Sequence, residues 1–292
     1  MKRRLALALT LVLGTGALGA LDLHAQAPGG QSRRADMNTM ERPIDMADEV
    51  WMAELTVLEV RDKIRDGWTT GIIMTGGIES NGPYLVTGKH NFVLEATGED
   101  IARRLGNALL APVMTIEPGN PENASSPGGI RLSQETYMAV MRDMATSMKA
   151  QGFTDILLFG DSGGNQRGME AVANELNETW RGSGTRAHYI REYYYEDIWS
   201  CEFLKTELNI HQQPDDCSAT RDLYHDDVHY SSIVATTDPA RIRVDQRMKS
   251  DQFSINGVSL APLERTLEVG RRLIEYRTDI TVRAIEKALA GG

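Results

Sequence analysis

An acidic and a basic side chain with the chemistry of a catalytic or metal site lie close together in the first third of the chain. Glu79 follows the apolar segment Gly71–Gly76, which predicts a buried strand, and His90 lies eleven residues further on. The turn-forming residues Asn81–Pro83 separate the two. Because ligands in open α/β sheets bind at the carboxyl ends of the strands, we expect Glu79 and His90 to face one ligand.

A second polar segment follows another predicted strand. Phe153–Phe159 is a continuous apolar run typical of a fully buried strand, and it leads into the polar segment Gly160–Gln166 and then a helix. Asp161 could add a carboxylate to the same site, or it could cap the helix, since acids favour helix N-termini. The backbone amides of Gly163 and Gly164 could form a small anion-binding nest. Two polar strand ends of this kind predict an active site.

Ser162 offers an alternative chemistry at the same strand end. It lies in Gly160-Asp-Ser-Gly-Gly164, which matches the Gly-x-Ser-x-Gly pattern of a serine nucleophile on a strand-to-helix turn. A serine hydrolase that uses Ser162 is therefore a second interpretation of this segment.

The first 27 residues have the composition of a secretory signal peptide. Lys2–Arg4 precede an apolar run from Leu5 to about Leu21, and His24–Ala27 supplies small residues typical of a cleavage site. A transmembrane anchor is the alternative, but glycines interrupt the run and its length is marginal. We expect residues 1–27 to be a signal peptide and the protein to be periplasmic or secreted.

Length and charge limit what the rest of the chain can be. Residues 28–45 form a polar leader, and residues 46–292 are numerous enough for a single α/β domain with a large core. The formal net charge is −10, and no basic stripe is present to neutralise phosphates. The composition therefore argues against binding to nucleic acid, and against binding to an anionic membrane after the signal peptide is removed.

Cys201 and Cys217 are the only cysteines of the sequence. In an oxidising periplasm they could close a loop of roughly 15 residues, which the chain-entropy model values at about 3 kcal/mol. The polar residues around them are typical of a stapled surface excursion, with free thiols as the alternative. Neither cysteine follows a strand or opens an apolar helix, which argues against a catalytic thiol.

Strands and helices alternate along the chain. We expect strands at Gly71–Thr75, Ala108–Ile116, Phe153–Phe159 and Arg186–Tyr195. We expect helices at Met46–Gly67, Asn91–Asn107, Gln166–Trp180 and Leu260–Leu289, and one from the N-cap Ser133 to Gln151. Methionines at three- and four-residue spacing in the last of these predict core filling. The alternation implies βαβ units, and therefore a three-layer α-β-α sandwich around a mostly parallel sheet.

Four segments of the chain resemble, in the same order, motifs of the creatininase (creatinine amidohydrolase) family. The family's Glu-x-His-Gly-Pro-His-Leu, followed by Gly-Thr-Asp, resembles Glu79–Leu85 and Gly88–His90. Its Pro-Gly-Thr-Ile-Ser-Leu resembles Pro127–Leu132, its Asn-Gly-His-Gly-Gly-Asn resembles Gly160–Asn165, and its His-Ala-x-x-x-Glu-Thr-Ser is similar to His225–Ser232. The resemblance covers about residues 70–245. It implies a creatininase-like α/β fold, hydrolysis of a C–N bond in a small cyclic or linear amide, and assembly into a homo-oligomer.

The chain keeps the family's metal-binding positions only in part. The resemblance implies a two-metal centre held by a Glu, a His, an Asp and a later His, with a carboxylate near the last motif. On this chain those positions carry Glu79, Asn81, His90, Ser162 and Tyr230. Asn81 and Ser162 are weak neutral ligands, whereas a histidine in place of the aspartate can still bind a metal. Glu79, His90 and Asp161 could together hold a divalent ion, zinc or manganese, and the number of ions, one or two, stays open.

The resemblance also implies roles for residues around the metal. His225 matches the family's histidine that passes a proton near the scissile bond, and a neutral imidazole can do this near pH 7. The alternative is a loop histidine paired with Asp226 or Asp227. The residues expected to contact the substrate are Asn81, Gly163, Gly164, Asn165 and Tyr230.

These observations leave three hypotheses for the function. The leading one is a secreted, metal-dependent amidohydrolase in which the metal lowers the pKa of a water and polarises the substrate carbonyl, while His225 acts as acid and base. The second is a non-catalytic small-molecule-binding or scaffold protein that kept the fold, because three of the family's ligand types are absent. The third is the serine hydrolase that uses Ser162.

Overall fold

The computed structural model describes residues 36–123, 127–195, 201–213 and 225–291. Glu41–Gly292 forms one compact unit, and Met1–Met40 is counted apart from it. The expected signal peptide at residues 1–27 lies outside the described residues and stays a prediction. In the described part of the chain, no helix combines the length and the apolarity that crossing a membrane requires.

A four-stranded parallel sheet forms the centre of the compact unit. Its strands lie in the order β2 (Ala108–Leu110), β1 (Thr70–Thr75), β3 (Asp155–Gly160) and β4 (Arg186–Tyr189). β1 and β3 pair along their whole length, from Thr70 opposite Asp155 to Thr75 opposite Gly160. Every residue of β1 is buried, as a continuous apolar run predicts for an inner strand covered on both faces. The predicted parallel sheet is confirmed.

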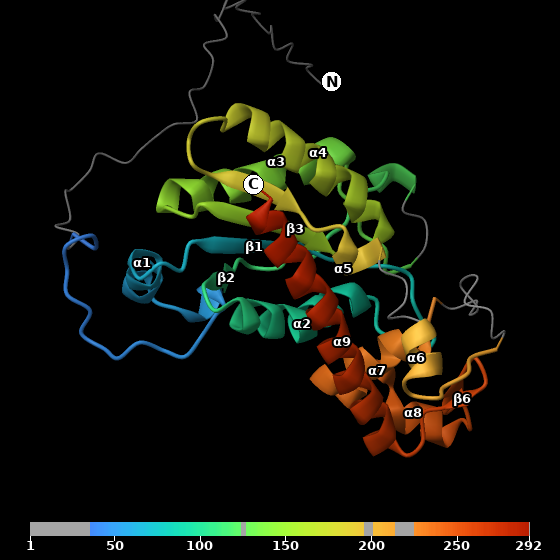
Figure 1. Cartoon of the computed structure of the whole chain (residues 1–292). Coiled ribbons are helices and arrows are strands. Elements are labelled where there is room, and N and C mark those ends of the chain that lie inside the picture. Colours follow the sequence, from blue (N-terminus) through green and yellow to red (C-terminus); the bar gives the residue numbers. More distant parts are fainter. Residues whose placement is uncertain (1–35, 124–126, 196–200, 214–224, 292) are drawn as a thin grey trace, which may run out of the picture. The chain divides into compact units, whose positions relative to one another are not determined.

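Helices cover both faces of this sheet (Figure 1). α3 (Gln134–Gln151) and α4 (Gly163–Thr179) pack on the face that carries Ile73 and Leu158, with α1 (Val57–Arg65) at its margin. α2 (Lys89–Leu105) and the last part of α9 (Leu263–Ala290) pack on the other face. Met141 and Met148 of α3 are buried in the first of these cores, which confirms core filling for the methionine row. The arrangement is the predicted three-layer sandwich.

A smaller group of helices continues the layer formed by α2 and α9. It contains α6 (Glu202–Thr206), α7 (Val228–Thr237), α8 (Val244–Lys249), the 3-10 turn Pro239–Ile242 and the hairpin of β5 (Ser254–Ile255) and β6 (Val258–Ser259). Its apolar core includes Ile233 of α7 and Leu273 of α9. α7 and α9 lie in close contact, because a side chain on Gly270 would overlap the carbonyl oxygen of Ser232.

Some element boundaries differ from the expected ones for local reasons. The predicted helix Met46–Gly67 contains only the 3-10 turn Met52–Glu54 and α1, because Thr56 caps α1 through a capping box with Glu59. The predicted strand Ala108–Ile116 pairs only as far as Leu110 and then makes one isolated bridge at Met114. A further 3-10 turn lies at Pro121–Asn123.

The predicted strand Arg186–Tyr195 is wrong beyond Tyr189. Its last residues form the short helix α5 (Glu192–Tyr195). Tyr193 is fully buried against Phe159, with ring centroids 4.7 Å apart, so tertiary packing outweighs the β propensity of three successive tyrosines. Cys201 is disulfide-bonded, and Cys217 lies outside the described residues.

Candidate active site

Glu79, His90 and Asp161 meet at the carboxyl ends of β1 and β3. Glu79 follows β1, Asp161 follows β3 directly, and His90 lies in the first turn of α2. His90 Nδ1 is 2.7 Å from Asp161 Oδ2, and His90 Nε2 is 2.8 Å from Glu79 Oε2. The sequence therefore predicted correctly which strand ends come together.

Carboxylates on both sides of His90 favour its cationic form. A hydrogen bond to a carboxylate oxygen needs a proton on the ring nitrogen, so an imidazole bonded to carboxylates on both sides carries two protons. Burial on its own would lower the pKa of His90, but its hydrogen bonds to Asp161 and Glu79 outweigh burial and raise that pKa. Burial would likewise raise the pKa of Glu79, yet His90 and the neighbouring charges lower it to about 2.

Arg277 is a second buried cation in the cluster, from the middle of α9. Its Nη2 lies 2.5 Å from Asp161 Oδ1, and neither side chain is more than 1% exposed. Its Nη2 and Nε also donate to the carbonyl oxygen of Tyr193, at 3.0 and 3.2 Å, and its guanidinium lies 3.9 Å from the centre of the Tyr193 ring. Asp161 is therefore bound from two sides, by His90 and by Arg277.

Lys89 is the third buried cation. Its Nζ lies 3.9 Å from Glu79 Oε2 and donates to the carbonyl oxygen of His225 at 2.8 Å. The ammonium also lies 4.4 Å from the centre of the Tyr230 ring. Burial lowers the pKa of Lys89 to about 8, against the opposing effect of Glu79 and Asp161.

His225 completes the cluster on its solvent-facing side. Its Nδ1 lies 3.2 Å from Glu79 Oε2, and 42% of its side chain is exposed. Its backbone has φ = 58°, a left-handed conformation that a residue with a Cβ adopts only when its surroundings impose it. The hydrogen bond from Lys89 to its carbonyl oxygen helps to do so. The result is a continuous row from buried Asp161 through His90 and Glu79 to exposed His225.

Ser162 lies beside this row but has a different partner. Its hydroxyl donates to Glu117, which is buried and forms an ion pair with Arg131. Only 3% of Ser162 is exposed. A serine nucleophile needs an open approach to its oxygen, and this one is covered and hydrogen-bonded to a carboxylate, so the arrangement does not favour the serine hydrolase hypothesis.

Two of the residues expected to bind substrate hold the backbone instead. The side-chain amide of Asn81 donates to the carbonyl oxygens of Val86 and Thr87 within its own loop. Asn165 is fully buried, and its amide donates to the carbonyl oxygens of Thr75 and Gly76 at the end of β1.

The other three divide between the exposed start of α4 and the packing around His90. Gly163 and Gly164 are exposed in the first turn of α4, and a Cβ on Gly163 would come within 2.9 Å of the hydroxyl of Tyr194. The Tyr230 ring packs edge-on against the His90 ring, with centroids 5.3 Å apart.

The donor atoms present do not fit a divalent metal. Each nitrogen of His90 points to a carboxylate, so a metal could bind this imidazole only after displacing a proton and an ion pair. Asp161 already balances Arg277, and Lys89 lies beside Glu79. Within the described ranges, no three or more His, Cys, Asp and Glu side chains are grouped so that they could hold a metal ion.

Three further charged residues belong to this site and were not predicted from the sequence: Lys89, Arg277 and Glu117. Lys89 lies within the first motif, and Glu117 follows the segment after β2 at the same edge of the sheet. The strand-end argument applied to this third strand would have found Glu117. Arg277 lies far from every motif in the sequence. The feature that points to it is the position of this charged residue within the apolar stripe of a long helix.

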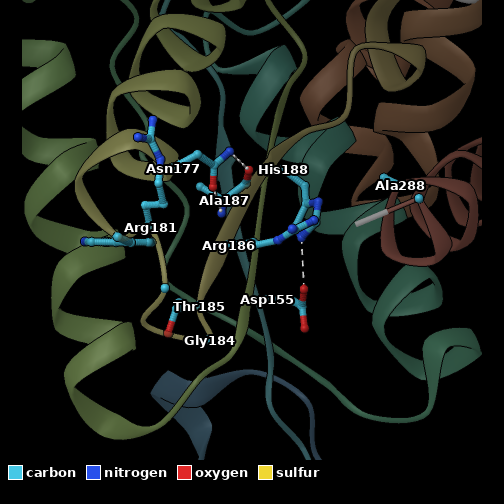
Figure 2. A pocket seen from close by; sticks show the side chains of 12 residues that line it. Asp155, Asn177, Arg181, Gly184, Thr185, Arg186, Ala187, His188 and Ala288 are labelled. Atoms are coloured by element: carbon cyan, nitrogen blue, oxygen red, sulfur yellow. Dashed lines mark hydrogen bonds and ion pairs between the residues drawn. The ribbon is translucent and has the colours of Figure 1, made fainter.

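A cavity of about 780 Å³ lies at the opposite, amino ends of β3 and β4. Figure 2 shows its lining, with His188 directed at Asp155, 2.9 Å away, and Asn177 at the backbone of Ala187. Asn177 donates to the Ala187 carbonyl at 2.7 Å and accepts from its N–H at 2.8 Å. These contacts satisfy backbone groups on the free edge of β4. Glu79, His90 and Asp161, which meet at the carboxyl ends of the strands, do not line this cavity.

Comparison with known proteins agrees with this architecture. A crystal structure of creatinine amidohydrolase (creatininase) is similar to the chain at 16% identity and a TM-score of 0.55, over 84% of this chain and 98% of that one. A manganese form of creatininase is similar at 15% identity and a TM-score of 0.54, over 82% of this chain and 97% of that one. A zinc–zinc form of a creatininase mutant is similar at 15% identity and a TM-score of 0.56, over 83% and 98% of the two chains. At such identities the likeness shows the fold.

The sequence comparisons identify the family. No curated protein sequence matches the chain. The sequence model of the creatininase family, described as creatinine amidohydrolase, matches residues 53–285, which is most of the chain. This match, together with the fold and the strand-end motifs, shows that the chain belongs to the creatininase family.

Proposed function

We propose that this chain hydrolyses a C–N bond in a small cyclic or linear amide, with His225 as the general acid and base. Membership of the creatininase family supports hydrolysis at a C–N bond. The observation that carries the proposal is the contact between Nδ1 of the partly exposed His225 and the carboxylate of Glu79. An imidazole oriented by a carboxylate is a common arrangement for proton transfer in hydrolases.

The contact with Glu79 determines which nitrogen of His225 can accept a proton. Glu79 is ionised, since its pKa is lowered to about 2, and its Oε2 lies 3.2 Å from His225 Nδ1, where it favours a proton on that nitrogen. In the neutral ring the lone pair then lies on Nε2. His225 Nε2 would take a proton from a water that attacks the amide carbon, and would return it to the leaving nitrogen when the C–N bond breaks.

The charge on the substrate oxygen needs donors near the same strand end. The first-turn amides of α4, at the exposed Gly163 and Gly164, are suited to this role because unpaired N–H groups at a helix N-terminus stabilise negative charge. The hydroxyl of Tyr194 lies beside Gly163 and provides a further donor.

A divalent metal was part of the sequence-based hypothesis. Zinc and manganese are named for two of the similar creatininase structures, which supports a divalent metal in relatives of this chain. Here Glu79, His90 and Asp161 would have to hold it, and all three are engaged in ion pairs. The mechanism above therefore contains no step at a metal. Secretion and assembly into a homo-oligomer stay part of the proposal on the sequence alone.

A second candidate function is small-molecule binding without catalysis. The observation in its favour is that the buried charges of the site satisfy one another, as in a structural network. Thermal-shift and calorimetric titration with small amides separate the two candidates, because a binding protein would be stabilised by a ligand that it never converts.

The test is an assay of amine or ammonia release from a panel of lactams, cyclic ureas and linear amides. His225→Gln should lower kcat/KM by at least about 100-fold, the usual contribution of a general acid or base. His211→Gln is the matched control, since His211 is an exposed histidine that forms a hydrogen bond with Asn209, and it should leave the rate unchanged. Turnover that survives in His225→Gln would refute the assignment, and binding without turnover across the panel would favour the second candidate.

A further inference from the structure

Two buried carboxylates at the centre of the cluster require positive charge close by. Asp161 is fully buried, and only 13% of the Glu79 side chain is exposed. An ionised carboxylate in such a place is costly unless it is paired. In a metal enzyme the metal ion supplies this positive charge, whereas in this chain basic side chains lie close to both carboxylates.

Side chains on two separate helices supply it. Lys89 and His90 come from the start of α2, and Arg277 comes from α9. His90 bridges the two carboxylates with hydrogen bonds of 2.7 and 2.8 Å, Arg277 binds the second oxygen of Asp161, and Lys89 lies 3.9 Å from Glu79. Each carboxylate therefore has two cationic neighbours.

These cations are held by further contacts, which would have to break before the side chains could move away to admit an ion. Arg277 is bound to the carbonyl oxygen of Tyr193 and lies against the Tyr193 ring. Lys89 is bound to the carbonyl oxygen of His225 and lies over the Tyr230 ring. A divalent ion at Glu79 or Asp161 would come within a few ångströms of fixed like charges, in a region where solvent screens little.

We propose that this chain takes up no divalent metal at the Glu79–Asp161 cluster, and that Lys89, His90 and Arg277 replace the metal as its counter-charges. The inference does not rest on the proposed hydrolysis. The absence of a metal is compatible with a hydrolase and with a binding protein. The test therefore measures metal content and thermal stability instead of turnover.

The test begins with the untagged full chain, isolated from medium supplemented with zinc and manganese. Elemental analysis after gel filtration should find far less than one ion per chain. Titration calorimetry with zinc and with manganese should show no saturable site, and the melting temperature should be the same with and without EDTA. One tightly bound ion per chain, or a melting temperature that falls in EDTA, would overturn the proposal.

A variant with family-type ligands provides the matched comparison. It combines Asn81→His, Lys89→Thr, His90→Asp and Ser162→His, which restores the residue types of the resembling family motifs at those positions. If this variant folds by circular dichroism, it should bind zinc more tightly than the wild type. Equal zinc binding by a folded variant and the wild type would show that these side chains do not decide metal uptake. If the variant does not fold, the wild-type measurements alone decide the question.

Discussion

Replacing Arg277 with methionine should strongly destabilise the protein. The guanidinium is 1% exposed and lies 2.5 Å from the fully buried Asp161, and it also donates two hydrogen bonds to Tyr193. Removing one partner of a buried ion pair costs about 3–5 kcal/mol, because the other charge stays buried with less compensation. In a chain of this size that corresponds to a fall in melting temperature of about 10 °C.

Urea unfolding at pH 7, followed by circular dichroism, measures this effect. Arg271→Met is the control on the same helix, since Arg271 is 63% exposed and pairs with the equally exposed Glu268 at 3.2 Å; its cost should stay below about 0.5 kcal/mol. The double variant Asp161→Asn/Arg277→Met should lose less than the sum of its single changes, because both members of the pair are gone. A loss below about 1 kcal/mol for Arg277→Met would refute the reasoning, and so would full recovery of its stability on addition of zinc.

Three further predictions test the pH dependence and the packing. The lowered pKa of Glu79, about 2 against a usual 4.5, adds stability above pH 4.5 that is lost as pH falls toward 2. The difference in unfolding free energy between wild type and Glu79→Gln should therefore shrink by about 3 kcal/mol over that range, and a constant difference would contradict it. Gly270→Ala places a Cβ against the Ser232 carbonyl and should cost about 1–3 kcal/mol, measured by thermal melting; an unchanged melting temperature would show that α7 and α9 are not so close. Asn177→Ala should speed amide exchange at Ala187 and cost about 1–3 kcal/mol, and unchanged exchange protection would rule out its role at the edge of β4.

The sequence predicted the architecture because the signals for it are local. The apolar runs at β1 and β3 have the length of buried strands, and the helical segments between them favour parallel pairing. The prediction failed at Tyr193–Tyr195, where the chain turns into a helix. The burial of Tyr193 between Phe159 and Arg277 decides that turn, and no neighbouring residue in the sequence signals it.

The candidate site could be predicted in part for a similar reason. Glu79 and Asp161 follow the strands that carry them, so the topology of the sheet was enough to bring them together. The ion pair between Asp161 and Arg277 depends instead on how α9 packs, and no spacing rule links the two positions. One signal was present: Arg277 interrupts an apolar stripe four residues after Leu273 and three before Ile280, and a charge in that position requires a buried partner.

The row of charges has two ends with different physical roles. At the buried end, Asp161 pairs with Arg277 and His90, so this end contributes mainly to the stability of the fold and to the orientation of His90. Glu79, next in the row, is hydrogen-bonded to His90 and lies 3.2 Å from His225 Nδ1, and a carboxylate held between two imidazoles is a poor base. In the proposed mechanism, proton transfer therefore takes place at the exposed end, where His225 meets solvent and lies beside Glu79. The network behind His225 would then do in this chain what a metal centre does in a metal hydrolase: it would hold charge at the end of the sheet and position the group that faces the substrate.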